Sequence, residues 1–166
     1  MSIREQLERD ELDFGIIIIS GASNHLQLLP MSKNQVVCWV PEDSPLAKKK
    51  TLSLQDVADA NVVMMKEGSF LRQTILTKMS AENITPNIVL ESNQVITLKG
   101  LVASGVGVAF LLDMVVEDTP GVKAIPLSDP IYVDVGLAWK KDRYISKAAQ
   151  SFIDFCKDLL KKKQEA

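Results

Sequence analysis

The chain has 166 residues, 46% of them hydrophobic and 24% charged, which is the composition of a globular protein with a buried core. Its 19 basic and 21 acidic residues give a net charge of −2, so this chain alone has too little positive charge to neutralise the phosphates of DNA. The longest uncharged apolar run, residues 100–112, is too short to cross a bilayer, and the N-terminus does not resemble a signal peptide. We therefore expect a cytoplasmic location, no membrane contact and reduced thiols at Cys38 and Cys156.

The first segment of the chain predicts a short helix followed by two strands. Residues 12–20 form a continuous isoleucine-rich run, which is typical of a strand covered on both faces. Residues 21–33 predict a loop, and residues 35–40 predict a second strand that Pro41 terminates.

The next segment predicts a surface connection, a strand and a helix. Residues 41–50 contain prolines, acids and a lysine run, so we expect a boundary between lobes there. Residues 62–65 predict a strand. Ser69 then begins a helix that runs to about Ala81, and three of its side chains recur at helical spacing and face inward: Leu71, Ile75 and Met79.

The centre of the chain predicts a strand that ends near Glu91 and a helix that follows it. Ser92 or Asn93 offers a side-chain oxygen to cap this helix. Four side chains recur at steps of three and four residues and give the helix one apolar face: Val95, Leu98, Leu101 and Val102.

Two glycines separate this helix from the next strand. Gly105 stands where a left-handed residue ends a helix, and Gly107 allows the backbone to pass close to its neighbour. Residues 108–112 then predict a fully buried strand. The unit is β-α-β, so its two strands are expected to be parallel.

The C-terminal segment predicts two further strands and a helix. Residues 122–125 form a strand, and residues 126–130 form a second break between lobes. Residues 131–139 alternate between large apolar and smaller or polar side chains, as in a strand with two different faces. Ser146 then caps a last helix with an apolar stripe of Ala149, Phe152, Ile153, Cys156, Leu159 and Leu160.

Five segments, in order along the chain, resemble the effector-binding domain of LysR-type transcriptional regulators. The central one is LVASGVGVAFLL at residues 101–112. The others are LDFGI at 12–16, VPEDSPLA at 40–47, GSFLR at 68–72 and SKAAQSF at 146–152. Ser44 stands where the family usually has histidine.

The resemblance implies an α/β, two-lobe periplasmic-binding-protein-like (type 2) fold. The first lobe would comprise residues 1–44 and 130–166, and the second residues 45–129. In the family, a strand, a helix and a strand precede the position matched by Met1, and a winged helix-turn-helix precedes those. We therefore expect an incomplete first lobe and DNA contact only through that absent N-terminal domain.

The same resemblance implies a sensor that binds a small metabolite, expected to be anionic, between two lobes and works as a homo-oligomer. Ligands of open α/β sheets lie beyond the carboxyl ends of strands. Three such places are Ser20-Gly21, Gly68-Ser69-Phe70 and Ser92-Asn93. By resemblance, the ligand-binding residues are Ile18, Ser20, Gly21, Gly68, Ser69, Phe70 and Arg72.

Structural interpretations of these residues remain open. Ser69 and Ser92 would also be explained as helix caps, and Arg72 either contacts an anion or pairs with Glu67. His25 is the single histidine and reads as a loop residue. We expect no catalytic residues, metal or cofactor, because no acid/base pair, metal-ligand spacing or phosphate loop is present. The alternative is a solute-binding or enzymatic relative of the same fold.

Overall fold

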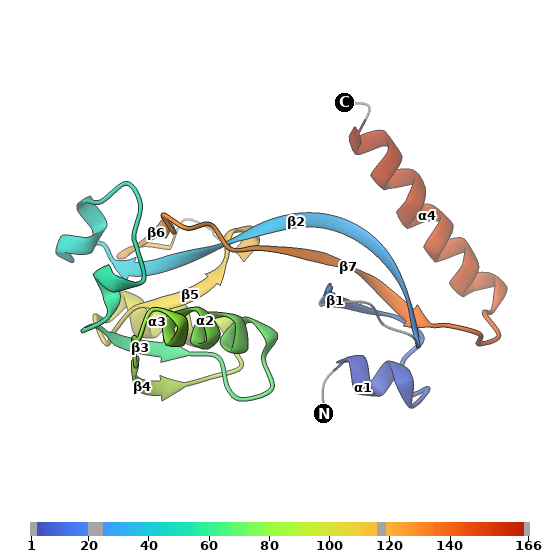
Figure 1. Ribbon diagram of the computed structural model, residues 1–166. Helices are drawn as coiled ribbons and strands as arrows, with labels where there is room; N and C mark the ends of the chain where they lie inside the picture. The colour runs from blue at the N-terminus through green and yellow to red at the C-terminus, as the bar shows by residue number, and fades with distance from the viewer. Residues whose placement is uncertain (1–2, 20–24, 116–118, 165–166) are drawn as a thin grey trace. The chain divides into compact units, whose positions relative to one another are not determined.

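The computed structural model describes residues 3–19, 25–115 and 119–164, and the chain packs as two compact units (Figure 1). Unit 1 combines the chain up to Lys33 with the chain from Val133 onward, and unit 2 spans Asn34–Tyr132. The chain therefore leaves unit 1 and returns to it. Residues 34–44, which the sequence assigned to the first lobe, pack in unit 2.

This difference arises from one long strand, β2 (Leu26–Pro41), whose 16 residues are shared by the two units. The predicted loop over residues 21–33 is wrong from Leu26 onward, while residues 20–24 lie outside the described part. Proline usually argues against a strand, but Pro30 lies where β2 has a sheet neighbour only on the β7 side. Pro41 ends the strand, as predicted.

Unit 1 is a small sheet in the order β1-β7-β2 with a helix on each face. Its elements are α1 (Ile3–Glu8), β1 (Gly15–Ile19), β7 (Tyr132–Lys140) and α4 (Lys147–Gln164). β1 and β7 are antiparallel, with Ile16 opposite Leu137. On the α1 face, Leu7 packs with Leu26 and Ala138, and on the α4 face Ile153 and Cys156 pack with Leu137 and Trp139.

β1 departs from the expectation of a strand covered on both faces. Ile16 is 59% exposed, and none of the five residues Gly15–Ile19 is fully buried. The reason is its position at the edge of the sheet, since the inward side chains of α4 reach β7 instead. The cap of α4 is confirmed, because Ala149 N donates to Ser146 Oγ at 3.2 Å.

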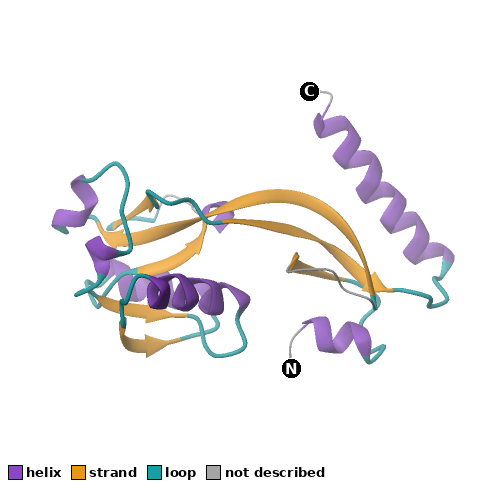
Figure 2. Cartoon of the chain, in the orientation of Figure 1, coloured by secondary structure: helices purple, strands orange, loops and turns teal. Residues whose placement is uncertain are grey.

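Unit 2 is organised around the second half of β2, which pairs antiparallel with β5 (Ala109–Leu112) and β6 (Val122–Pro126). Alternate residues of β2 face opposite sides of the sheet. Val36, Cys38 and Val40 pack with the inward residues of α2 (Phe70–Ala81), which are Leu71, Ile75 and Met79, as predicted. Val37 and Trp39 pack with Leu98 and Val102 of α3 (Val95–Ala103). Both faces of β2 are therefore buried in this unit. Figure 2 shows the strands of the unit together with its helices.

The central β-α-β unit is confirmed, with a third strand between its two strands. β3 (Asn61–Met64) pairs parallel with β4 (Asn87–Glu91), and Val62 forms a parallel bridge with Val108 just before β5. α3 ends at Ala103, and Gly105 has a φ of 74°, the left-handed conformation expected after a helix. The short 3-10 helices are Pro45–Lys48, Gln55–Val57 and Asp113–Val115.

No helix in the described ranges is both long and apolar enough to cross a membrane.

Among the glycines of unit 2, Gly107 has the least space for an added side chain. A Cβ added there would lie 2.4 Å from the carbonyl oxygen of Asn61, so Gly107→Ala forces the backbone of β3 to move. We expect a loss of roughly 1–3 kcal/mol in the free energy of unfolding. Chemical denaturation measures this change.

Gly100→Ala is the matched control, because Gly100 is exposed within α3 and an added Cβ meets no atom within 4 Å. This variant should gain about 0.5–1 kcal/mol through the higher helix propensity of alanine. Equal effects of the two substitutions would show that the contact with Asn61 does not constrain the fold.

Candidate functional site

The carboxyl ends of β3 and β4 meet at one edge of unit 2. Their parallel register places Met64 beside Glu91, and the N–H of Ser92 donates to the carbonyl oxygen of Met64 at 3.0 Å. Loops that follow parallel strands therefore leave the sheet at the same edge. This edge is the place where the sequence predicts ligand contacts.

The start of α2 lies in one of these loops. Gly68 has a φ of 85° and turns the chain, and Ser69 then takes the N-cap position with an extended backbone. Its Oγ accepts a hydrogen bond from Arg72 N at 3.5 Å. The N–H groups of Phe70 and Leu71 have no acceptor within the helix, because the first turn of any helix lacks one. These donors and the positive end of the helix dipole favour an anionic group.

The side chain of Arg72 connects the carboxyl ends of β3 and β4. Its Nη1 donates to the carbonyl oxygen of Met65 at 2.9 Å and to Oε1 of Glu91 at 2.5 Å. The Arg72 side chain is only 13% exposed, whereas that of Glu91 is 37% exposed. The ionic partner of Arg72 is therefore Glu91, and the alternative pairing with Glu67 is wrong. The charge of the guanidinium is balanced from within the chain.

The predicted site residues fall into three groups. Gly68, Ser69, Phe70 and Arg72 are together at the start of α2. Ile18 lies on β1 in unit 1, partly buried and opposite Val135 of β7. Ser20 and Gly21 lie outside the described residues. Ligand contact by each of these residues remains a prediction.

The predicted cap of α3 by Ser92 or Asn93 is wrong. The N-cap is Gln94, whose side chain makes no capping hydrogen bond, although its Oε1 accepts from Thr97 Oγ1 at 3.2 Å. Ser92 Oγ instead accepts from the N–H of Gln94 at 3.1 Å and closes the turn before the helix. The hydroxyl therefore stabilises the connection between β4 and α3.

The sequence did not indicate that Glu91 belongs to this site. Nineteen positions separate Arg72 from Glu91, so helical spacing cannot connect them. The available signal was the parallel order of the two strands, which brings residues at strand ends to one edge. Glu91 ends β4, and Arg72 lies one turn into the helix that follows β3.

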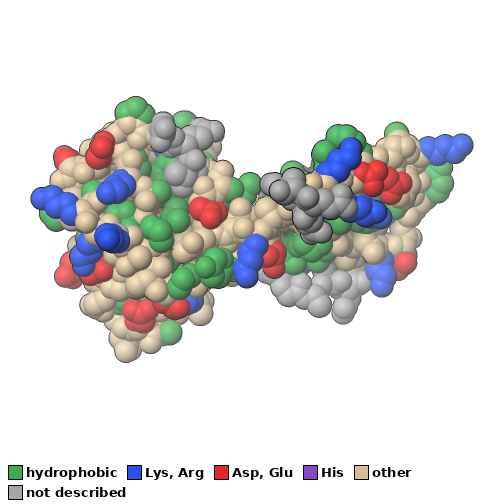
Figure 3. Space-filling view, turned by 90° about the horizontal axis from the view of Figure 1, so that it is seen from above, with side chains coloured by type: hydrophobic (Ala, Val, Ile, Leu, Met, Phe, Trp, Pro, Cys, Tyr) green, Lys and Arg blue, Asp and Glu red, His purple; other side chains and the backbone are tan. Residues whose placement is uncertain are grey.

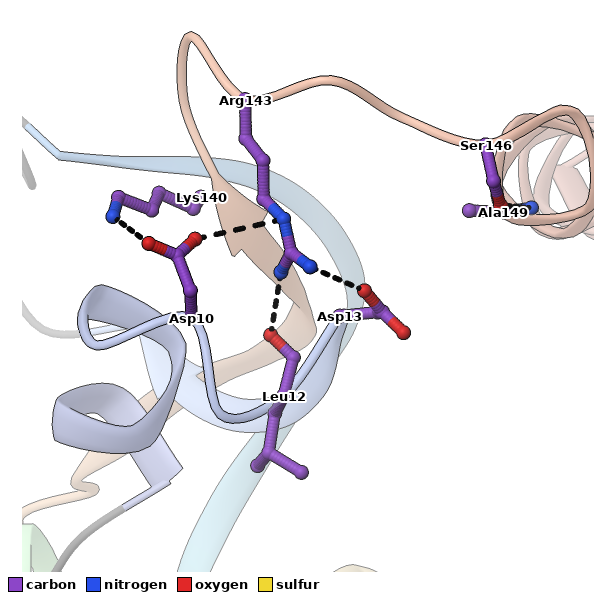
Figure 4. Close-up of polar contacts among 7 residues, drawn as sticks. All are labelled: Asp10, Leu12, Asp13, Lys140, Arg143, Ser146 and Ala149. Atoms are coloured by element: carbon purple, nitrogen blue, oxygen red, sulfur yellow. Dashed lines mark hydrogen bonds and ion pairs between the residues drawn. The ribbon is translucent and has the colours of Figure 1, made fainter.

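A second polar cluster lies in unit 1, where α1 is followed by β1 and where α4 begins (Figure 4). Arg143 donates to the carbonyl oxygen of Leu12 at 3.2 Å and contacts Asp13 at 2.9 Å and Asp10 at 3.5 Å. Lys140 also pairs with Asp10, and this hydrogen bond lowers the pKa of the Asp10 carboxyl. Two cations balance two carboxylates, so the cluster connects segments and carries no net charge.

The two cysteines and the histidine are the other side chains with reactive chemistry. Cys38 and Cys156 are buried, and burial raises the pKa of the Cys38 thiol. His25 is exposed before β2. Among the described residues, no group of three or more histidine, cysteine or acidic side chains is arranged to hold a metal ion.

The chain is similar to part of several known transcriptional regulators. The family model described as the LysR substrate binding domain matches residues 1–161. The transcriptional regulator YybE of Bacillus subtilis, itself uncharacterised, is 31% identical over 149 residues, which cover 89% of this chain and 51% of YybE. The dual regulator GltC of the same bacterium is 31% identical over 124 residues, covering 73% of this chain and 41% of GltC. The chain thus spans about half the length of the curated relatives it matches.

Solved structures agree with this assignment. The effector-binding domain of QuiR in complex with shikimate has a TM-score of 0.86 and 28% identity, and the match covers 96% of this chain and 77% of QuiR's domain. The regulatory domain of CcmR from Synechocystis in complex with 2-PG has a TM-score of 0.85 at 22% identity. That match covers 96% of this chain and 78% of the CcmR domain, and it supports the fold.

The geometry of the Arg72–Glu91 pair predicts a measurable coupling. Because Arg72 is largely desolvated, a double-mutant cycle with Arg72→Gln and Glu91→Gln should give an interaction energy of about 0.5–1 kcal/mol. Urea denaturation of the four proteins measures it. The control cycle uses Lys78 and Asp129, whose side chains are 36% and 76% exposed. Its coupling should be below about 0.5 kcal/mol. Equal couplings in the two cycles would contradict the view that Arg72 stabilises the connection between the ends of β3 and β4.

Proposed function

Because this chain belongs to the LysR substrate-binding domain family, we propose that it senses a small, anionic effector for a LysR-type transcriptional regulator. It has the α/β, type 2 periplasmic-binding-protein-like fold of effector-binding domains in that family. The match of the family model over residues 1–161 is the observation that carries the proposal. On this proposal the chain binds a ligand and performs no catalysis.

The start of α2 supports an anionic ligand. It presents the hydroxyl of Ser69 and the first-turn N–H groups, and the positive end of the helix dipole adds to their attraction. Arg72 is already paired with Glu91, so neutral donors would carry most of the recognition. Shikimate, which is bound by the similar domain of QuiR, is a small carboxylate and therefore an anion of the proposed kind.

The proposed ligand contacts are the residues predicted from the sequence. Gly68, Ser69, Phe70 and Arg72 come from unit 2, and Ile18, Ser20 and Gly21 come from the chain of unit 1. We further propose that the protein acts as a homo-oligomer in the cytoplasm and that DNA is contacted by another domain. The curated relatives are transcriptional regulators, which favours this function over that of a transport protein or an enzyme of the same fold.

A ligand screen tests the proposed function directly. Small carboxylates should raise the melting temperature of the chain, because a ligand that binds only the folded state stabilises it. Isothermal titration calorimetry then measures the affinity of each hit. A collection of carboxylates and amino-acid metabolites that leaves the melting temperature unchanged would argue against an anionic effector.

Ser69→Trp should abolish binding of the effector found in that screen, because the indole would fill the space beside the helix start. The fold should survive, with a loss of about 0.5–2 kcal/mol from the missing cap. Ser69→Asp separates the two roles, since aspartate is a good cap but repels an anion. Both variants are compared with the parent chain by calorimetry.

The control for these variants is Ser80→Trp, which places the same side chain at an exposed position near the other end of α2. It should bind the effector with unchanged affinity. Unchanged affinity in Ser69→Trp would mean that Ser69 only caps the helix.

These 166 residues alone should show no sequence-specific DNA binding. Their net charge is −2, and the matched family model describes a substrate-binding domain. A mobility-shift assay with operator and scrambled duplexes measures this. Tight binding that distinguishes the two duplexes would contradict the prediction.

A further inference from the structure

Glu91 brings a negative charge to the first turn of α2, where the proposed function requires an anion to bind. Its Oε1 accepts a hydrogen bond from Nη1 of Arg72 at 2.5 Å. The backbone N–H of the same arginine donates to Oγ of Ser69 at 3.5 Å, which is the cap of the helix. A carboxylate beside the positive end of a helix is stabilised by the helix dipole. Glu91 therefore already uses part of the positive potential that would attract an anionic ligand.

The sheet fixes the backbone that carries this carboxylate. Glu91 is the last residue of β4 and lies beside Met64 in the parallel register of β3 and β4. The N–H of Ser92 then donates to the carbonyl oxygen of Met64 at 3.0 Å. The end of β4 is therefore held beside the loop that leads from β3 to α2.

The two members of the ion pair differ in their exposure to solvent. The side chain of Arg72 is 13% exposed, and its Nη1 also donates to the carbonyl oxygen of Met65 at 2.9 Å. The side chain of Glu91 is 37% exposed. A ligand that arrives from solvent therefore meets the carboxylate more readily than the guanidinium.

The remaining charges of the chain do not offset Glu91. The net charge is −2, and Figure 3 shows both basic and acidic side chains on the face that it draws. Exposed charges further away than about 8 Å are largely screened at physiological salt. In the loop before α2, Lys66 and Glu67 carry opposite charges. The local charge at the helix start therefore depends on Arg72 and Glu91.

We propose that Glu91 is a specificity-determining residue of the effector site, which makes the site prefer effectors with one negative charge over effectors with two. The hydroxyl of Ser69 and the first-turn N–H groups can donate to one carboxylate. A second negative group beside the helix start would be repelled by Glu91, and the charge of Arg72 is already balanced. This inference rests on the proposed function, because it concerns the anionic effector of the same site.

Glu91→Gln tests the inference, because glutamine keeps the size of the side chain and an oxygen that can accept from Arg72 but removes the charge. The probes are the carboxylates found in the ligand screen and two matched pairs, succinate with succinamate and phthalate with phthalamate. In each pair an amide replaces one carboxylate. Isothermal titration calorimetry measures each affinity, and circular dichroism melting verifies that the variant is folded.

We expect Glu91→Gln to bind carboxylates roughly threefold to tenfold more tightly than the parent chain does. The parent chain should bind each half-amide more tightly than the dicarboxylate, and Glu91→Gln should reduce or reverse that preference. The gain should shrink as the salt concentration rises, because ions screen the interaction between charges.

Arg72→Gln separates the charge of Glu91 from its contact with Arg72. If the charge acts on the ligand, Glu91→Gln also tightens binding in the Arg72→Gln background. A glutamate that only held Arg72 in place would give a different result. Its substitution would weaken binding in the parent chain and change nothing in the Arg72→Gln background, and this result would overturn the inference.

Asp129→Asn is the matched control, because Asp129 pairs with Lys78 in the last turn of α2. It removes the same charge at the other end of the helix, so affinity should change by less than about twofold. An equal gain in this control would refute a specific role of Glu91. Carboxylates that bind the parent chain but bind Glu91→Gln no more tightly refute it as well and leave the proposed function in place. Carboxylates that bind neither protein contradict both.

Discussion

The close contact between β3 and the backbone at Val108 is the constraint on which unit 2 depends. Val63 N donates to Val108 O, and Val108 N donates to Asn61 O, each at 2.8 Å. The approach is possible because Gly107 has no Cβ to meet the Asn61 carbonyl. This contact connects the parallel strands β3 and β4 with β5, and β5 in turn pairs with β2. It therefore holds β3, whose carboxyl end leads to α2, beside the start of β5.

The proposed ligand site at the start of α2 combines a fixed framework with neutral donors. Arg72 spans the ends of both strands, and its charge is matched by Glu91 within the chain. A guanidinium held in this way positions the loop and contributes little net charge to a ligand. Recognition of an anion would then rest on the hydroxyl of Ser69 and on backbone N–H groups, whose directions the helix fixes. Such donors need no reorganisation on binding.

In unit 1, ion pairs and apolar side chains lie in different places. The ion pairs of Asp10 and Asp13 with Lys140 and Arg143 connect segments from opposite ends of the chain. Ile16 of β1 and Phe152, Phe155 and Leu159 of α4 remain exposed, even though Ile153 and Cys156 of the same helix are buried. The core of this unit is centred on β7, because β7 lies between β1 and β2 in the sheet.

The sequence by itself determined the elements whose pattern is local. Helical spacing identified the buried face of α2, and the glycine at 105 marked the end of α3. Ser146 was predicted to cap α4, and a helix cap was one of the two interpretations of Ser69. The five ordered motifs also identified the family. Each cap and each helix face depends on residues within a few turns of one another, and each family motif is a short run, so the sequence displays them directly.

Only the tertiary structure decided the features that join distant residues. The sequence could not show that β2 begins at Leu26, because that end of the strand is stabilised by pairing with β7 about a hundred residues later. It could not select Glu91 as the partner of Arg72, nor show that Ile16 lies at an uncovered edge. Strand order and the ends of parallel strands are properties of long-range pairing, and one sequence carries no local signal for them.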